Sequence, residues 1–125
     1  MELLNRVDYR LADTPAERDI IYALRYRAYL KEGAVEPNRD ARVTDRFDDL
    51  DNSWVFGVYL DGELASSLRI SVASLDHPET PSMDVFGDLL RPELEAGKVL
   101  VDPTRFVADP DSARRSPELP YITLR

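Results

Sequence analysis

The stretch SWVFGVYLDGELASSLRISVA, residues 53–73, predicts the centre of the fold. Asp61-Gly62 is typical of a two-residue hairpin turn, because both positions of such a turn need positive φ. The arm before the turn, 53–60, alternates in the manner of a half-buried strand, and 63–73 does the same. One face of the first arm carries Trp54, Phe56, Val58 and Leu60. We therefore expect an antiparallel hairpin.

The second arm of this hairpin divides its side chains between two faces with a period of two. One face is predicted to carry Leu64, Ser66, Leu68, Ile70 and Val72, and the other to carry Ala65, Ser67, Arg69, Ser71 and Ala73. Arg69 thus rises from a face of small residues, which leaves room for a ligand.

Before the hairpin, the sequence predicts a strand and a helix. Asn5–Leu11 alternates as a strand does, and Thr14-Pro15-Ala16-Glu17 combines a capping box with proline at the first helical position. The helix should end near Gly33. Its apolar stripe consists of Ile20, Ile21, Leu24 and Ala28, and Arg25 borders that stripe.

The remaining segments are shorter or less regular. Residues 34–50 are polar and predict an ordered loop with a short helix, and 75–81 predicts a second loop. Ser82 is expected to cap a helix over 83–90 that pauses at Pro92 and ends at Gly97.

A strand is predicted over 98–107, with a bulge or an unpaired position near Pro103, because proline cannot donate to a sheet ladder. Residues 108–120 predict a loop, and 121–125 the opening of a further element.

Composition excludes several classes of function. The 125 residues are 43% hydrophobic and 32% charged, as expected of one globular domain. Without Cys and with one His, a disulfide, a thiolate nucleophile or a metal site built on several Cys or His residues is excluded. No segment approaches the length of a membrane span, and residues 1–6 lack the basic-then-apolar order of a signal peptide, so we expect a cytoplasmic protein.

Net charge opposes nucleic acid as a partner. It is −8 overall, yet residues 98–125 hold five basic and four acidic side chains, so an anion site is expected towards the C-terminus. His77 precedes Pro78 outside any recognisable triad context, which leaves Ser–His–Asp catalysis without support.

Three arginines and three aspartates lie on elements that could converge in one α/β layer: Arg25, Arg69, Arg105, Asp45, Asp48 and Asp102. Guanidinium groups bind carboxylates in a bidentate manner and Asp binds ammonium, so such a cluster suits an amino-acid-like ligand. A plain network of ion pairs would have the same composition.

These residues resemble the pattern of a known group of enzymes. Leu24-Arg25-x-x-x-Tyr29, Asp45-Arg-Phe-Asp48, Leu68-Arg69-Ile70 and Asp102-x-x-Arg105-Phe106 follow, in order and spacing, acyl-homoserine-lactone synthases and the related N-acyl amino acid synthases. Both groups belong to the GNAT superfamily of N-acyltransferases. The resemblance implies an α/β (α+β) fold with a mixed, mostly antiparallel sheet flanked by helices.

The resemblance also implies an activity and roles for individual residues. The expected reaction transfers a fatty acyl group from an acyl carrier protein or acyl-CoA thioester to the α-amine of an amino acid or a similar small amine. The thioester is a co-substrate, and no tightly bound cofactor is expected. Asp102 and Arg105 are expected to be catalytic. The implied acceptor-binding residues are Arg25, Tyr29, Asp45, Asp48 and Arg69, and the implied donor-binding residues are Phe106, Val107, Arg114 and Arg115.

Two departures from the lactone-synthase pattern bear on the substrate. Asp102 stands where those enzymes usually have Glu, and Val35 stands near the place of a usual Trp. The second departure favours an amino acid over S-adenosylmethionine. A lactone synthase proper and a non-catalytic binding or dimerisation module are the alternatives.

The superfamily fold continues past the strand over 98–107, so we expect the C-terminal strands to be missing from these 125 residues. A truncated product, a partial gene product or strands supplied by another chain would each account for this. Because an uncovered strand edge promotes pairing, we expect self-association.

Overall fold

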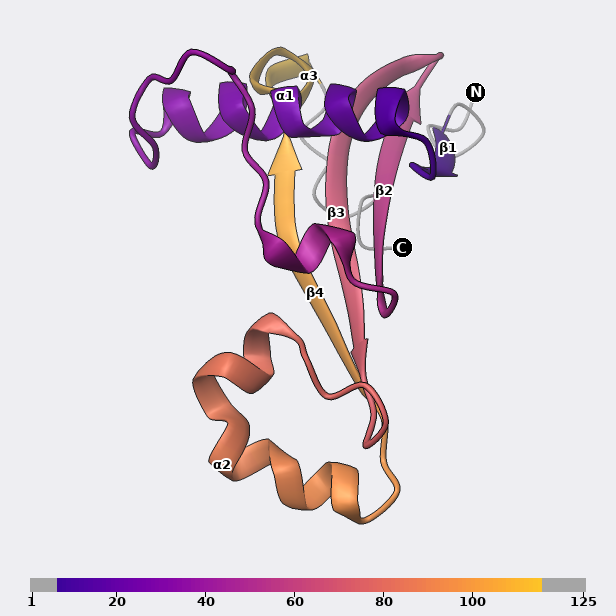
Figure 1. Ribbon diagram of the computed structural model, residues 1–125. Helices are drawn as coiled ribbons and strands as arrows, with labels where there is room; N and C mark the ends of the chain where they lie inside the picture. Colours follow the sequence, from indigo (N-terminus) through magenta and orange to yellow (C-terminus); the bar gives the residue numbers. More distant parts are fainter. Residues whose placement is uncertain (1–6, 116–125) are drawn as a thin grey trace.

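The computed structural model of the chain describes residues 7–115. In chain order the elements are β1 (Val7–Leu11), α1 (Pro15–Lys31), the 3₁₀ helix η2 (Arg46–Asp49), β2 (Ser53–Leu60), β3 (Glu63–Ala73), α2 (Pro81–Glu95), β4 (Leu100–Ala108) and α3 (Pro110–Arg115). Within these residues the strands form one antiparallel sheet in the order β1-β2-β3-β4 (Figure 1). No helix between residues 7 and 115 is long and apolar enough to cross a membrane.

The β2–β3 hairpin is confirmed, including its turn. Asp61 has φ 52° and Gly62 has φ 85°, the left-handed conformation that a two-residue turn demands. Pairing runs from Leu60 opposite Glu63 to Ser53 opposite Ser71. The buried hydroxyls of Ser53 and Ser71 are 2.7 Å apart.

The predicted alternation along β3 fails near the turn. Val58 pairs with Ser66 but Tyr59 pairs with Leu64, so Ala65 is an extra residue in the ladder. Leu64 consequently packs with the residues under α1, whereas Ala65 packs on Val7, Leu60 and α3. A bulge reverses the faces on either side of it, and periodicity alone does not reveal one.

Helix α1 begins and ends as predicted. The Thr14 side chain accepts a hydrogen bond from the Glu17 N–H, and Pro15 opens the helix. Gly33, with φ 73°, follows its end. Ile20 was expected in the apolar stripe but is 52% exposed, so that assignment is wrong, whereas Ile21, Leu24, Arg25 and Ala28 are buried.

Helix α2 differs from its prediction at its start and at its kink. Thr80 caps it by accepting a hydrogen bond from the Met83 N–H, and Pro81 occupies its first turn. The expected cap, Ser82, therefore lies inside the helix. The kink falls at Phe86, which has non-helical φ and ψ, and Pro92 lies within the second half of the helix.

Strand β4 contains the predicted irregularity, but not at Pro103. Pro103 pairs in register with Ile70, whereas Ser67 pairs with Val107 and Arg69 with Thr104. Leu68 therefore faces two residues of β4, Arg105 and Phe106. Arg105 has φ 53°, so the bulge is centred on an arginine in the left-handed region.

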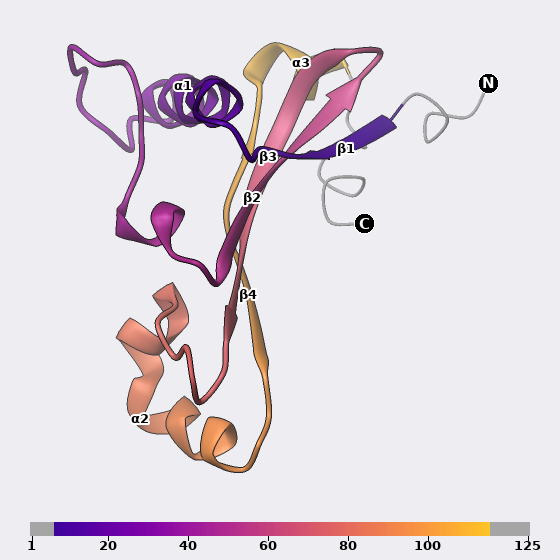
Figure 2. The same cartoon turned by 45° about the vertical axis from the view of Figure 1, so that its right-hand side comes forward.

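The core lies between α1 and one face of the sheet. Ile21 packs on Val55, and Leu24 and Ala28 pack on Val107. Figure 2 shows α1, η2 and α2 on the same side of the sheet. The η2 part of the polar segment 34–50 therefore lies against the sheet, whereas residues 34–42 are mostly exposed.

The stretch 108–120 was expected to be a loop but begins with helix α3. Asp109 caps this helix, since its carboxylate accepts hydrogen bonds from the N–H and the hydroxyl of Ser112. A hexapeptide helix is too short to show a hydrophobic period, and this explains why the sequence did not predict it. The start of the first predicted strand, residues 5–6, the end of the predicted loop, residues 116–120, and the element expected to open over 121–125 lie outside the described residues.

Candidate functional site

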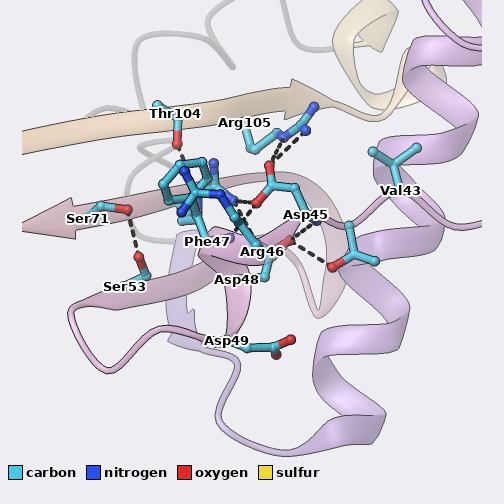
Figure 3. A network of polar contacts seen from close by, with 12 residues as sticks. Val43, Asp45, Arg46, Phe47, Asp48, Asp49, Ser53, Ser71, Thr104 and Arg105 are labelled. Atoms are coloured by element: carbon cyan, nitrogen blue, oxygen red, sulfur yellow. Dashed lines mark hydrogen bonds and ion pairs between the residues drawn. The ribbon is translucent and has the colours of Figure 1, made fainter. Parts of the chain in front are cut away.

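Five of the charged residues singled out in the sequence meet in one cluster between α1, η2, β3 and β4. They are Arg25, Asp45, Asp48, Arg69 and Arg105. Figure 3 shows Asp45 and Asp48 on the η2 segment, with Arg105 reaching Asp45 from β4. We call these five residues the ionic cluster. The capping box of η2 holds its two aspartates in place.

The innermost pair of the ionic cluster is Arg25 with Asp48. Their two contacts, Nη1 to Oδ2 at 2.8 Å and Nη2 to Oδ1 at 2.9 Å, form a bidentate pair. Neither side chain has any exposed surface. Since removing one partner would leave a buried charge alone, this pair is a fixed part of the core.

Asp48 receives more hydrogen bonds than a core ion pair alone would supply. Its Oδ2 also accepts from the Thr44 hydroxyl and the Asp45 N–H, each at 2.9 Å. Burial raises the pKa of Asp48 by favouring the neutral acid. The hydrogen bonds and the charge of Arg25, together with hydrogen bonds from the Asp45 N–H and the Thr44 hydroxyl, outweigh burial and lower this pKa to about 2. Asp48 is therefore a permanent anion and no candidate for proton transfer.

Arg69 connects the two aspartates. Its Nη1 lies 2.5 Å from Asp45 Oδ1 and 3.1 Å from Asp48 Oδ1, and its Nε donates to the Thr104 hydroxyl at 3.0 Å. The side chain is 2% exposed. The room predicted around Arg69 is thus filled by carboxylates, and no space for a ligand surrounds its guanidinium.

Arg105 closes the outer side of the ionic cluster. Its Nη2 and Nε lie 2.8 and 3.1 Å from Asp45 Oδ2. An unbroken strand would turn Arg105 to the face opposite Thr104, but the extra residue in β4 returns it to the same face. The bulge is therefore what brings Arg105 to Asp45.

Asp45 and Arg105, which we call the outer pair, both have shifted pKa values. Burial raises the pKa of Asp45, but hydrogen bonds from Arg69 and Arg105 outweigh that effect, so the pKa lies below its usual value. Burial lowers the pKa of Arg105, and its hydrogen bonds with Asp45 and Tyr29 more than offset this and raise it. Both groups are charged at neutral pH.

Tyr29 links the ionic cluster to a pocket. The Arg105 guanidinium carbon is 5.7 Å from the centre of the Tyr29 ring. Tyr29 also lines a pocket of about 470 Å³ between α1, the end of β4 and α3. Phe106, Val107 and Ala113 are further lining residues. Two of the four predicted donor-binding residues thus lie at this pocket.

Asp102 lies on β4 outside the ionic cluster. It is 8% exposed, and its Oδ2 accepts a hydrogen bond from the Ser82 N–H at 2.7 Å, in the first turn of α2. It pairs with Ser71, and this pair lies two residues along each strand from the pair of Arg69 and Thr104. The carboxylate therefore points to the same face as the ionic cluster, roughly 7 Å along the strand at the Cα level.

Arg114 and Arg115 were expected in a loop, but both lie in the last turn of α3. Arg114 pairs with Asp111, and both side chains are exposed. The first turn of α3 is occupied by the Asp109 carboxylate. Within the described residues, the arginines stand beside the pocket without lining it.

Sequence reasoning missed the hydroxyls that complete the cluster. Thr44 and Thr104 bind Asp48 and Arg69, respectively. Thr104 lies within the Asp102-x-x-Arg105 motif and Thr44 directly precedes Asp45, so the signal in each case was a polar residue next to a charged one. No group of three His, Cys, Asp or Glu in residues 7–115 is arranged to hold a metal ion.

An antiparallel sheet with a bulged fourth strand, crossed on one face by α1 and a buried Arg–Asp cluster, defines a GNAT-like N-acyltransferase fold. The family model of the N-acyl amino acid synthase FeeM matches residues 20–125, and the chain belongs to this family. The resemblance drawn from the four motifs and the predicted fold class are thereby confirmed.

Among solved structures, the chain is similar to FeeM, an N-acyl amino acid synthase from uncultured soil microbes. The TM-score is 0.69 at 18% sequence identity, with 95% of this chain and 62% of that chain covered. This likeness shows the fold, and the chain spans less than two thirds of the FeeM chain. No curated protein matches the chain.

Proposed function

We propose that the protein transfers an acyl group from a thioester to the α-amine of an amino acid. The observation that carries the proposal is the ionic cluster, whose outer pair, Asp45 and Arg105, adjoins the pocket lined by Tyr29. Charged groups for a zwitterion and a cavity for a thioester arm thus lie side by side. Family membership supports the same reaction class.

In the proposed reaction the amine nitrogen attacks the thioester carbonyl carbon. A C–N bond forms and the C–S bond breaks. The ammonium first gives one proton to a base, the nitrogen loses a second proton as the amide forms, and the departing thiolate takes up that second proton and leaves as the thiol. Asp102 is the proposed base, because it lies on the same face of β4 as Arg105.

The donor is proposed to be an acyl-CoA or an acyl carrier protein. Lys31 lines the pocket, and Arg114 and Arg115 follow Ala113 of the lining on α3. These cations support a donor whose arm carries phosphate. Cytoplasmic location and self-association are proposed from the sequence alone, and light scattering tests the second.

Product analysis tests the proposed function. The protein would be incubated with long-chain acyl thioesters of CoA and of a carrier protein, together with amino acids and S-adenosylmethionine, and the products read by mass spectrometry. We expect an N-acyl amino acid. An acyl-homoserine lactone would favour the lactone-synthase alternative, and no product from folded protein would contradict the proposal.

The base is tested by Asp102→Asn, which retains an oxygen for the Ser82 N–H and keeps the fold. We expect at least about a 100-fold loss of turnover. Asp88→Asn, on the exposed surface of α2, is the matched control and should leave turnover unchanged. Full turnover in Asp102→Asn would exclude Asp102 as the base.

A further inference from the structure

Within residues 7–115, the outer pair is the part of the ionic cluster that reaches the surface. The side chains of Asp45 and Arg105 are 25% and 30% exposed. Arg25 and Asp48 are 0% exposed, and Arg69 is 2% exposed. A ligand approaching the cluster therefore meets Asp45 and Arg105, and the three inner residues are positioning residues.

Asp45 is held in a way that leaves its bond to Arg105 replaceable. Oδ1 accepts from Arg69 Nη1 at 2.5 Å and from the Phe47 N–H at 2.9 Å. Arg105 contacts Oδ2 alone (Figure 3). Moving Arg105 away would free Oδ2 while Oδ1 keeps the carboxylate anchored.

The pairing of the Arg105 guanidinium with Asp45 is in turn not the strongest that the two groups could form. Its Nε and Nη2 share one carboxylate oxygen, whereas the strongest pairing of guanidinium with carboxylate joins two nitrogens to two oxygens. A ligand carboxylate could adopt that two-to-two geometry. The carboxylate of Asp45 cannot, because Arg69 and Phe47 hold its other oxygen.

On the basis of the proposed acyl transfer, we propose that the acceptor amino acid binds by separating this pair. Its carboxylate takes the fork of Arg105, and its ammonium takes Oδ2 of Asp45. One ion pair is replaced by two, and charge balance is preserved because the pair and the zwitterion are both neutral. No covalent bond changes in this step.

The exchange specifies the class of acceptor. Both charges of the zwitterion are used, so an amine without a carboxylate and a carboxylic acid without an amine each satisfy only one member of the separated pair. The other member would remain with an unmatched charge, at a cost in affinity. The acceptor is therefore a free α-amino acid, and Arg105 determines this specificity.

The position of the pair also suits the subsequent reaction. Arg105 lies beside Tyr29, and Tyr29 lines the pocket of about 470 Å³. An amino acid whose carboxylate is on Arg105 would have its nitrogen on Asp45, beside that pocket. The ammonium must then give its proton to another base, because the pKa of Asp45 lies below its usual value.

Calorimetric titration of the whole 125-residue protein, without any thioester, tests the inference. The standard amino acids are titrated first, and the tightest binder is then compared with its decarboxylated and deaminated analogues. We expect each analogue to bind at least about tenfold more weakly. Equal affinities, or no binding of any amino acid at millimolar concentration, would overturn the inference.

Variants test whether amino acid binding requires Arg105 itself or only a positive charge on the surface. Arg105→Gln should weaken amino acid binding at least about tenfold, and Arg105→Lys should restore part of the loss. Arg42→Gln is the matched control, since Arg42 forms a partly exposed pair with Asp19 at 2.6 Å, and it should bind normally. Unchanged binding in Arg105→Gln would contradict the proposal. If that variant does not fold, the analogue series on the wild type decides.

The titration also distinguishes this inference from the proposed function. If amino acid binding depends on Arg105 but the protein makes no acylated product, the binding inference holds and the proposed acyl transfer is wrong. If wild type and folded Arg105→Gln form acylated product equally, the proposed acyl transfer holds and the binding inference is wrong.

Discussion

The two ends of the ionic cluster contain the same chemistry in different surroundings. Arg25 and Asp48 form a bidentate pair with no exposed surface, whereas Arg105 and Asp45 form a pair that is about a quarter to a third exposed. The inner pair has no route to a ligand and stabilises the core. In our proposal the outer pair exchanges partners with a ligand. Burial, rather than residue type, therefore distinguishes the two ends of the ionic cluster.

The largest expected effect is the loss of the inner pair. Arg25→Met leaves Asp48 buried with only part of its compensation, and we expect the free energy of unfolding to fall by about 3–5 kcal/mol. Urea denaturation measures it. Arg42→Gln, which breaks an exposed pair, should cost less than about 1 kcal/mol. Similar losses in the two variants would contradict the distinction.

Acid should destabilise the protein through the inner pair. The pKa of Asp48 is about 2 in the folded state against 3.8 ordinarily, so its contribution is complete above pH 3.8 and disappears as pH falls towards 2. The expected loss is about 2 kcal/mol, seen in denaturation curves over this window. In Asp48→Asn this part of the pH dependence should vanish, and an unchanged profile would count against the assignment.

The outer pair should contribute less to stability. Arg105→Gln leaves Asp45 held by Arg69 and Phe47, so we expect the free energy of unfolding to change by less than about 1 kcal/mol. Thermal or urea denaturation measures it. A loss as large as that of Arg25→Met would mean that both ends of the cluster are structural.

The smallest expected effect is that of salt. A double-mutant cycle on Asp45 and Arg105 should give a coupling of about 0.5–1 kcal/mol that shrinks in 1 M NaCl, because the pair is partly exposed. The cycle on Arg25 and Asp48 should hardly respond. A salt-insensitive outer pair would indicate that solvent does not reach it.

The sequence predicted local structure where the signal was local. The Asp61-Gly62 turn and the Thr14 cap each depend on a few adjacent residues, and both were found. Bulges depend on how two strands pair, so the one at Ala65 was missed, and the one predicted near Pro103 is centred two residues further on, at Arg105. Burial is also a tertiary property, which is why Ile20 was misassigned and Arg69 was expected to have space around it.

For the candidate site, too, the sequence predicted what depends on local motifs and missed what depends on tertiary packing. The motifs identified all five members of the ionic cluster, because they lie on α1, at η2, on β3 and on β4, the elements that surround it. Spacing could not say which members are sealed in the core, or that Asp102 accepts from the Ser82 N–H beyond the cluster. Those facts depend on the packing of η2 and α2 against the sheet.

The central claim is that a ligand reaches Arg105 and not Arg25 or Arg69. Nitrogen-15 NMR of the arginine Nε–H groups, recorded on the wild-type protein during titration with the tightest-binding amino acid, tests it most directly. The account predicts a saturable shift of the Arg105 resonance while those of Arg25 and Arg69 stay in place. Equal shifts at Arg25, or a stationary Arg105, would contradict it.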